Sequence, residues 1–195
     1  VIARGVALVR AGDASALCTA PIHKKALQDG ARFAYPGHTE YLAALGQSKR
    51  AVMMLASDQL RVVPATIHIA LEDVATALTP EVLAETIIIT AEGLRRQFGI
   101  ADPRIAVAGL NPHAGEDGKM GGEEIAMITP VLDALRAQGM DIAGPMSADT
   151  MFHAGARARY DVAVCMYHDQ ALIPIKTLDF SGGVNVTLGL PFIRT

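Results

Sequence analysis

The stretch that organises this chain is Cys165-Met-Tyr-His-Asp-Gln-Ala-Leu-Ile-Pro-Ile-Lys176. It begins at the end of an apolar run, 161–166, that predicts a buried strand. Where this strand stops, the chain places four adjacent polar side chains, those of Tyr167, His168, Asp169 and Gln170. In open α/β sheets, ligands bind beyond the carboxyl ends of the strands. The stretch is therefore either an ordinary polar loop or one edge of a ligand site.

Strands and helices alternate outward from this stretch. Apolar runs predict strands at 15–20, 51–56, 61–69, 104–108 and 184–188, and helical spacing predicts helices at 2–9, 38–45, 80–98 and 123–138. Thr79-Pro80-Glu81 is typical of a helix start. Pro64 predicts an edge or a bulge, Thr129-Pro130 a kink, and 143–150 a loop. The alternation predicts an α/β fold with a largely parallel sheet flanked by helices, and the missing Gly-x-Gly-x-x-Gly motif argues against an ordinary Rossmann cofactor site.

Composition narrows the class of protein. The 195 residues are 51% hydrophobic and 19% charged, which is typical of a soluble globular chain. The net charge is -3 and the basic residues do not cluster, so a nucleic-acid partner is not expected. No apolar run approaches the roughly 20 residues that span a bilayer. Cys18 and Cys165 lie in apolar runs, so we expect two buried thiols and a reducing, cytoplasmic location.

Both ends of the chain suggest a piece of a longer protein. The first residue is Val1, and Arg194-Thr195 follows an apolar run without a cap or a polar tail. We therefore expect residues 1–195 to be an interior fragment, and the sequence offers no domain boundary within it.

Three of the six histidines share one context. His68, His113 and His168 each follow an apolar run that predicts a strand. Three imidazoles with an open position form the ligand set of a catalytic divalent metal, typically zinc. Their spacing matches no local motif such as His-Glu-x-x-His, so three unrelated polar loops remain an alternative. His153 lies in a helix-like segment and is expected at the surface.

A second set of residues suits a phosphate group. It comprises His38, Thr39, Lys176, Asn185 and Arg194. A helix start at His38-Thr39 offers free backbone N–H groups, and lysine and arginine add charge-assisted hydrogen bonds. Taken one at a time, Lys176 and Arg194 are more often simply solvated surface residues. Asp149 and Asp169 are candidate acids or bases, or carboxylates that orient a histidine, although either could be a helix cap.

Six blocks of sequence then resemble the 4-hydroxythreonine-4-phosphate dehydrogenase family of pyridoxal phosphate biosynthesis. They are Thr19-Ala-Pro-Ile-His-Lys24, Gly37-His-Thr-Glu40, Gly109-Leu-Asn-Pro-His-Ala-Gly-Glu116, Ala148-Asp-Thr150, Tyr167-His-Asp-Gln170 and Gly183-Val-Asn-Val-Thr-Leu-Gly-Leu-Pro191. They occur in order over nearly the whole chain. The resemblance implies a fold like that of isocitrate and isopropylmalate dehydrogenases, of which this chain would be the central and C-terminal part.

The resemblance also implies roles for the candidate residues. His68, His113 and His168 would bind a divalent metal at the interface of a homodimer, the first from one subunit and the other two from its partner. His38, Thr39, Lys176, Asn185 and Arg194 would hold the substrate, chiefly its phosphate. Asp149 and Asp169 would be the acidic residues of the active site. The family's Gly-Asp-Pro-Ala-Gly and Asp-His-Gly-Thr-Ala blocks are not in this sequence, so no residue is assigned to the nicotinamide cofactor.

The implied function is a metal-dependent oxidation linked to NAD or NADP, followed by decarboxylation. The substrate would be a phosphorylated 3-hydroxy acid, 4-hydroxythreonine 4-phosphate or a close analogue, and the metal zinc, magnesium, manganese or cobalt. Relatives acting on erythronate or threonate 4-phosphate are an alternative, and those acting on dihydrodiols of aromatic acids are a less favoured one. From the residues alone, a three-histidine zinc hydrolase and a metal-stabilised binding module also stay open.

Overall fold

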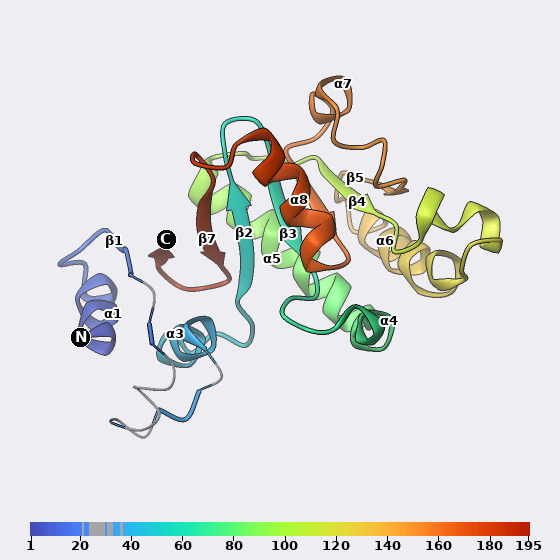
Figure 1. The fold of residues 1–195 in the computed structure, drawn as a ribbon. Helices are drawn as coiled ribbons and strands as arrows, with labels where there is room; N and C mark the ends of the chain where they lie inside the picture. The colour runs from blue at the N-terminus through green and yellow to red at the C-terminus, as the bar shows by residue number, and fades with distance from the viewer. Residues whose placement is uncertain (21, 24–29, 31–32, 36) are drawn as a thin grey trace.

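A six-stranded sheet forms the centre of the computed structural model, which describes residues 1–20, 22–23, 30, 33–35 and 37–195 (Figure 1). In spatial order its strands are β5 (Ile142–Met146), β4 (Ile105–Ala108), β6 (Val162–Cys165), β3 (Arg61–Pro64), β2 (Val52–Ala56) and β7 (Val184–Leu188). The first four are mutually parallel, whereas β2 pairs antiparallel with both of its neighbours. The predicted α/β class with a largely parallel sheet is confirmed.

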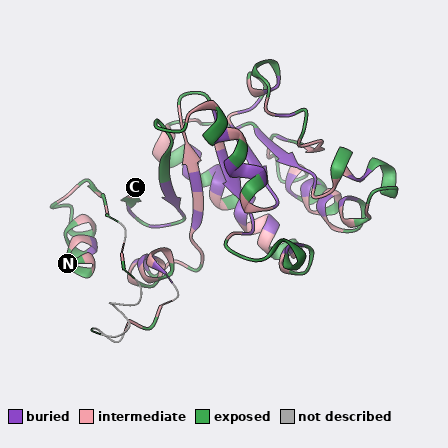
Figure 2. Ribbon diagram, viewed as in Figure 1, coloured by how far each residue is buried: buried purple, intermediate pink, exposed green. Residues whose placement is uncertain are grey.

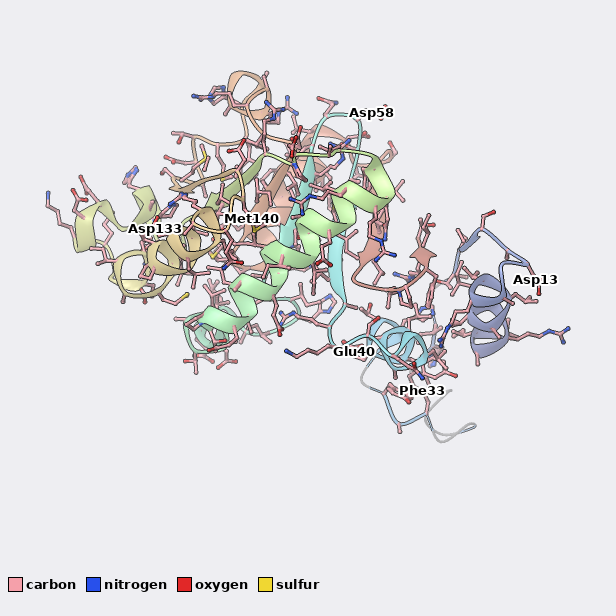
Figure 3. The ribbon with its side chains drawn as sticks, turned by 180° about the vertical axis from the view of Figure 1, so that it is seen from behind. Asp13, Phe33, Glu40, Asp58, Asp133 and Met140 are labelled. Atoms are coloured by element: carbon pink, nitrogen blue, oxygen red, sulfur yellow. The ribbon has the colours of Figure 1, made fainter. Side chains whose placement is uncertain are left out.

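Helices cover both faces of this sheet. On one face, α5 (Pro80–Phe98) and α6 (Thr129–Arg136) pack against it, and on the other lies α8 (His168–Leu178). Every residue of β4 and β6 is buried, because these inner strands are enclosed between the helical layers (Figure 2). Figure 3 shows the face that α5 crosses. The apolar faces of three layers thus form the core.

A smaller unit flanks the large sheet on the side of β7 (Figure 1). It consists of α1 (Ile2–Ala11), α3 (His38–Gly46) and the parallel pair of β1 (Ala16–Leu17) and β8 (Ile193–Arg194). Its own apolar cluster includes Val6, Leu42, Leu190 and Phe192. This unit brings the last strand of the chain beside the first, which decides where Arg194 lies.

The helix boundaries follow the predicted signals. Thr79 Oγ1 accepts a hydrogen bond from the backbone N–H of Val82 at 3.2 Å, and α5 ends at Gly99, whose φ is 69°. The predicted kink at Thr129-Pro130 is a change from a π-helical segment, η3 (Glu124–Ile128), to α6. Further short helices in the described residues are η1 (Leu71–Asp73), α4 (Val74–Ala77), η2 (Pro112–Gly118) and α7 (Ala154–Arg157).

No single helix in the described part of the chain is both long and apolar enough to cross a membrane. Only Leu71–Ala77 and Pro80–Phe98 taken together meet the requirement, and they are bent by 88°.

Four sequence-based expectations about strands were wrong. The expected strand 61–69 ends at Pro64, and β3 lies inside the sheet rather than at an edge or a bulge. β3 pairs with β2 only at Arg61 and Val62. Pro64 therefore has no partner on β2, so its missing N–H group costs no hydrogen bond there. Residues 142–146, taken largely as loop, form the edge strand β5, where a proline is tolerated. The strand 15–20 shrinks to Ala16–Leu17.

One expectation about the cysteines was also wrong. Cys165 is buried in β6, as expected, but Cys18 follows the short strand β1 and is exposed. Both thiols are free.

Candidate active site

The candidate residues follow the carboxyl ends of four neighbouring parallel strands. Asp149 follows β5, His113 follows β4, His168 follows β6 and His68 follows β3. Because these strands run parallel in the order β5-β4-β6-β3, all four ends lie on one edge of the sheet. This placement agrees with the expectation drawn from the sequence and makes that edge the candidate active site.

His68 and His168 lie beside each other at this edge. Their ring centroids are 5.6 Å apart and the rings are tilted by 43°. Both histidines line a cavity of about 260 Å³ together with Tyr167 and Asp169. With Zn–N bonds of about 2.0–2.1 Å, two rings at this separation are close enough to bind one ion.

Each of two histidines has an aspartate beside its Nδ1 atom. Asp169 Oδ1 lies 2.7 Å from Nδ1 of His168, and Asp149 Oδ2 lies 4.0 Å from Nδ1 of His113. Ser147 Oγ donates a hydrogen bond of 2.6 Å to the other oxygen of Asp149. A carboxylate on Nδ1 orients the ring and leaves Nε2 for a metal. The donor set therefore fits a divalent metal.

The described part of one chain does not gather all three histidines. His113 is not among the residues that line the cavity of His68 and His168. No three histidine, cysteine, aspartate or glutamate side chains within the described residues are close enough to hold a metal ion. One chain thus offers two separate parts, the His68–His168 pair and the His113–Asp149 pair.

His113 sits in a left-handed turn. The φ angles of His113, Ala114, Glu116 and Asp117 are 52°, 51°, 41° and 54°. Each non-glycine residue in this region costs about 1–2 kcal/mol. Such backbone persists only where the surroundings determine it, and it clusters at functional sites. His68 is also left-handed, with φ at 54°, so two of the three histidines are held in costly backbone conformations.

Arg194 and His38 form a second cluster, beside β1 and α3. The guanidinium donates from Nη1 to Thr187 Oγ1 at 2.9 Å and from Nη2 to Thr19 Oγ1 at 3.0 Å. Arg194 Nε and His38 Nε2 are both buried and have no partner among the described residues. Two buried nitrogens without acceptors suit an anionic ligand. The sequence-based reasoning did not identify Thr187. It lies two residues after Asn185, so both side chains share one face of β7, and this spacing was the available signal.

Burial and neighbouring charges shift the pKa values of His38 and Arg194. Burial, and then the positive charge of Arg194, lower the pKa of His38 below its ordinary value. Burial also lowers the pKa of Arg194, and the nearby Cys18 opposes that effect. A bound phosphate would supply the negative charge that this pair lacks.

The other predicted substrate residues have different surroundings. Thr39 is half-buried in the first turn of α3, whose first residues have no side-chain cap. Asn185 precedes Val186, which belongs to the apolar cluster of α5, so Asn185 faces the opposite side of the sheet, as Thr187 does. Lys176 is exposed on α8, with Nζ 5.9 Å from the ring centroid of Phe180. The hydrogen bonds and ion pairs of the described residues join Arg194 to Thr187 but to neither Lys176 nor Asn185. Within the block 19–24, residues 21 and 24 lie outside the described residues.

Comparisons with known proteins cover the whole chain. The family model described as "Pyridoxal phosphate biosynthetic protein PdxA" matches residues 1–195. A 4-hydroxythreonine-4-phosphate dehydrogenase of Roseobacter denitrificans is 71% identical over 196 residues, which are 100% of this chain and 60% of that protein. One from Ruegeria sp. is 66% identical, again over 100% of this chain and 60% of that protein. The chain thus spans about 60% of the length of these relatives.

Solved structures match closely. The 4-hydroxythreonine-4-phosphate dehydrogenase of Klebsiella pneumoniae has a TM-score of 0.93 and 46% identity, over 99% of this chain and 58% of that one. A terephthalate 1,2-cis-dihydrodiol dehydrogenase of Burkholderia xenovorans has a TM-score of 0.81 and 27% identity, over 99% of this chain and 60% of that one.

Proposed function

The chain belongs to the pyridoxal phosphate biosynthetic protein PdxA family, and from this we propose that the whole protein is a dehydrogenase of 4-hydroxythreonine 4-phosphate. It would oxidise the 3-hydroxyl group with NAD or NADP, after which the product loses carbon dioxide. The observation that supports this best is the row of Asp149, His113, His168 and His68 after four adjacent parallel strands. We place the protein in the cytoplasm, where two free thiols are stable.

His68, His113 and His168 would hold a divalent metal, zinc in the first place, with magnesium, manganese or cobalt as alternatives. Imidazole is a good ligand for zinc. Bound there, the ion supplies a Lewis acid that makes the substrate hydroxyl more acidic. Asp169 would orient the ring of His168 from its Nδ1 atom, whereas Asp149 lies 4.0 Å from Nδ1 of His113, outside hydrogen-bond distance.

Other roles of the site's side chains would be proton transfer and substrate binding. Asp149 or Asp169 would accept the proton of the substrate hydroxyl, and a bound nicotinamide would supply the hydride acceptor. The 3-oxo acid then releases carbon dioxide, because its carbonyl accepts the electron pair of the breaking C–C bond. His38, Thr39, Lys176, Asn185 and Arg194 hold the substrate, chiefly the phosphate, and so position the reacting carbon.

The complete site would need two subunits. Within one chain, His113 stands apart from the His68–His168 pair. A homodimer with the site at its interface would let the partner supply the missing ligands. The family resemblance assigns His68 to one subunit and His113 and His168 to the other. The 5.6 Å contact of His68 with His168 favours a division in which only His113 comes from the partner.

A substrate screen with the full-length protein tests the function. 4-Hydroxythreonine 4-phosphate, erythronate 4-phosphate and threonate 4-phosphate are each incubated with NAD and with NADP, and reduced nicotinamide is followed by absorbance. We expect the fastest turnover with 4-hydroxythreonine 4-phosphate. Faster turnover of another phosphorylated acid would move the assignment within the family. Turnover of an unphosphorylated dihydrodiol alone, or hydrolysis without cofactor reduction, would overturn it.

A further inference from the structure

Glu124 is a buried acid that the proposed mechanism does not use. It begins the π-helical segment η3 and is 3% exposed. Both of its carboxylate oxygens accept hydrogen bonds from one residue: Oε1 from the backbone N–H of Asn111 at 2.7 Å, and Oε2 from Asn111 Nδ2 at 2.9 Å. Glu123 Oε2 accepts from the same Nδ2 at 2.7 Å. The carboxylate therefore fixes both the backbone and the side chain of Asn111.

The same carboxylate touches the turn that carries His113. A Cβ atom added at Gly115 would lie 2.7 Å from Glu124 Oε2, and one added at Gly109 would lie 3.0 Å from Oε1. Gly109 ends the strand side of this turn and Gly115 lies in its middle. The absence of side chains at these two glycines lets the carboxylate reach between them.

Backbone hydrogen bonds close the turn around this anchor. Ala114 N–H donates to the Asn111 carbonyl at 3.1 Å, and Met120 N–H donates to the Gly115 carbonyl at 3.1 Å. Asn111 is thus held on one side by Glu124 and bonded on the other to the residue that follows His113. A π-helical turn, an arrangement that recurs at functional sites, begins at the residue that makes both contacts.

We propose that Glu124 is a positioning residue: through Asn111 it holds the left-handed turn 113–117 and thereby fixes the direction of the His113 imidazole. The importance of that direction rests on the proposed function, in which His113 is a metal ligand. The effect of Glu124 on the conformation of the turn does not depend on that function. In this proposal Glu124 acts on the His113 imidazole through Asn111 and the turn, and not by contact with metal or substrate.

The hydrogen bonds between Asn111 and Glu124 indicate which substitution tests the proposal. The two Asn111 groups are both donors, and a carboxylate offers two acceptor oxygens to them. Glu124→Gln keeps the volume but places an NH₂ group against one donor. Glu92→Gln on the exposed face of α5 is the matched control, because it removes one carboxylate far from the turn.

The test measures Zn²⁺ affinity of the full-length protein by competition with a chromogenic chelator. We expect Glu124→Gln and His113→Ala each to weaken Zn²⁺ binding by about tenfold or more. Because Glu124 acts through His113, the double variant should bind no more weakly than His113→Ala alone. Glu92→Gln should bind as the wild type does. Unchanged affinity in Glu124→Gln, or additive losses in the double variant, would overturn the proposal.

A second readout separates this proposal from the metal assignment. Amide hydrogen exchange of 113–117 should accelerate in Glu124→Gln and stay unchanged in Glu92→Gln, whether or not metal binds. If His113→Ala keeps wild-type Zn²⁺ affinity, the metal role of His113 is wrong, and exchange alone decides on Glu124. In that case, unchanged amide exchange of 113–117 in Glu124→Gln refutes the proposal that Glu124 holds the turn. Should Glu124→Gln fail to fold, Asn111→Ala, which removes only the side-chain donor, is carried through the same measurements with the same expected directions.

Discussion

At the scale of single residues, His38 and Arg194 form a site whose charges are unbalanced. A guanidinium fixed by Thr187 and Thr19 lies close enough to His38 to lower its pKa. Both residues keep a buried nitrogen free of hydrogen bonds to the described residues. The sequence indicated the residue types that suit a phosphate. It did not indicate that the two residues lie near each other, because the pairing of β1 with β8, which places Arg194 beside Thr19, is a tertiary property.

Phosphate binding should change the protonation of His38. Burial and the positive charge of Arg194 lower its pKa in the free protein and so favour the neutral ring. A bound phosphate dianion favours the imidazolium and raises that pKa. Binding of the phosphorylated substrate should therefore take up protons at a pH between the two values. Calorimetric titration in buffers of different ionisation enthalpy measures this uptake, and His38→Asn should abolish it. Equal apparent enthalpies in all buffers would contradict the prediction.

The same shift gives the sign of a stability effect. Because the folded-state pKa of His38 is depressed, the folded protein binds protons less readily than the unfolded chain does. The stability associated with neutral His38 is therefore present above pH 6.5 and is lost as the pH falls through the folded pKa.

Replacing Arg194 tests its proposed role in phosphate binding. In that role Arg194 is a charge-assisted donor remote from the reacting carbon, so for Arg194→Ala we expect KM to rise by roughly 10- to 100-fold with little change in kcat. Steady-state kinetics of the full-length enzyme measure both constants. Arg96→Ala, on the exposed face of α5, is the control and should leave both unchanged. A fall in kcat at unchanged KM would assign Arg194 to the chemical step instead.

At the scale of secondary structure, short-range signals decided which elements the sequence could predict. Thr79-Pro80 and Gly99 mark the two ends of α5, because capping is a local interaction. Strand β5 was missed because Gly144-Pro145 is typical of a loop, and only its edge position makes it tolerable. The pairing that makes Pro64 acceptable inside the sheet is likewise a tertiary property.

The N-cap of α5 provides a local test of stability. Thr79→Ala removes the acceptor of the Val82 N–H group, so we expect a loss of about 1 kcal/mol in the free energy of unfolding. Urea denaturation of the wild type and the variant measures the difference. Thr79→Ser retains the hydroxyl and should retain most of the stability. An equal loss in both variants would assign the effect to the methyl group of Thr79 rather than to the cap.

At the scale of the whole molecule, topology brings distant residues to one edge. The sequence predicted that His68, His113 and His168 follow strands, and parallel pairing in the order β4-β6-β3 places all three on one edge of the sheet. It could not predict the left-handed turn at His113 or the buried support of Glu124. The turn is unfavourable by local propensity, and the contact of Asn111 with Glu124 joins residues 13 positions apart, which local signals do not predict.

Mixtures of inactive variants test how subunits share the site. His68→Ala and His113→Ala should each be inactive as full-length homodimers. If the two histidines of one site come from different subunits, a hybrid dimer keeps one site with both residues intact. Random re-pairing of equal amounts should therefore restore about a quarter of the wild-type activity. A mixture that stays inactive although hybrids form would place both residues of a site in one subunit.

A second mixture, of His68→Ala with His168→Ala, then distinguishes the two divisions of ligands. It should regain the same activity if His68 comes from one subunit and His168 from the other, as the family resemblance implies. It should stay inactive if both serve one site from the same chain, as their 5.6 Å separation favours. Because hybrids form equally in both mixtures, the first mixture is the control for the second. Activity in the second mixture would show that the contact of the two rings within one chain is not the contact that binds the metal.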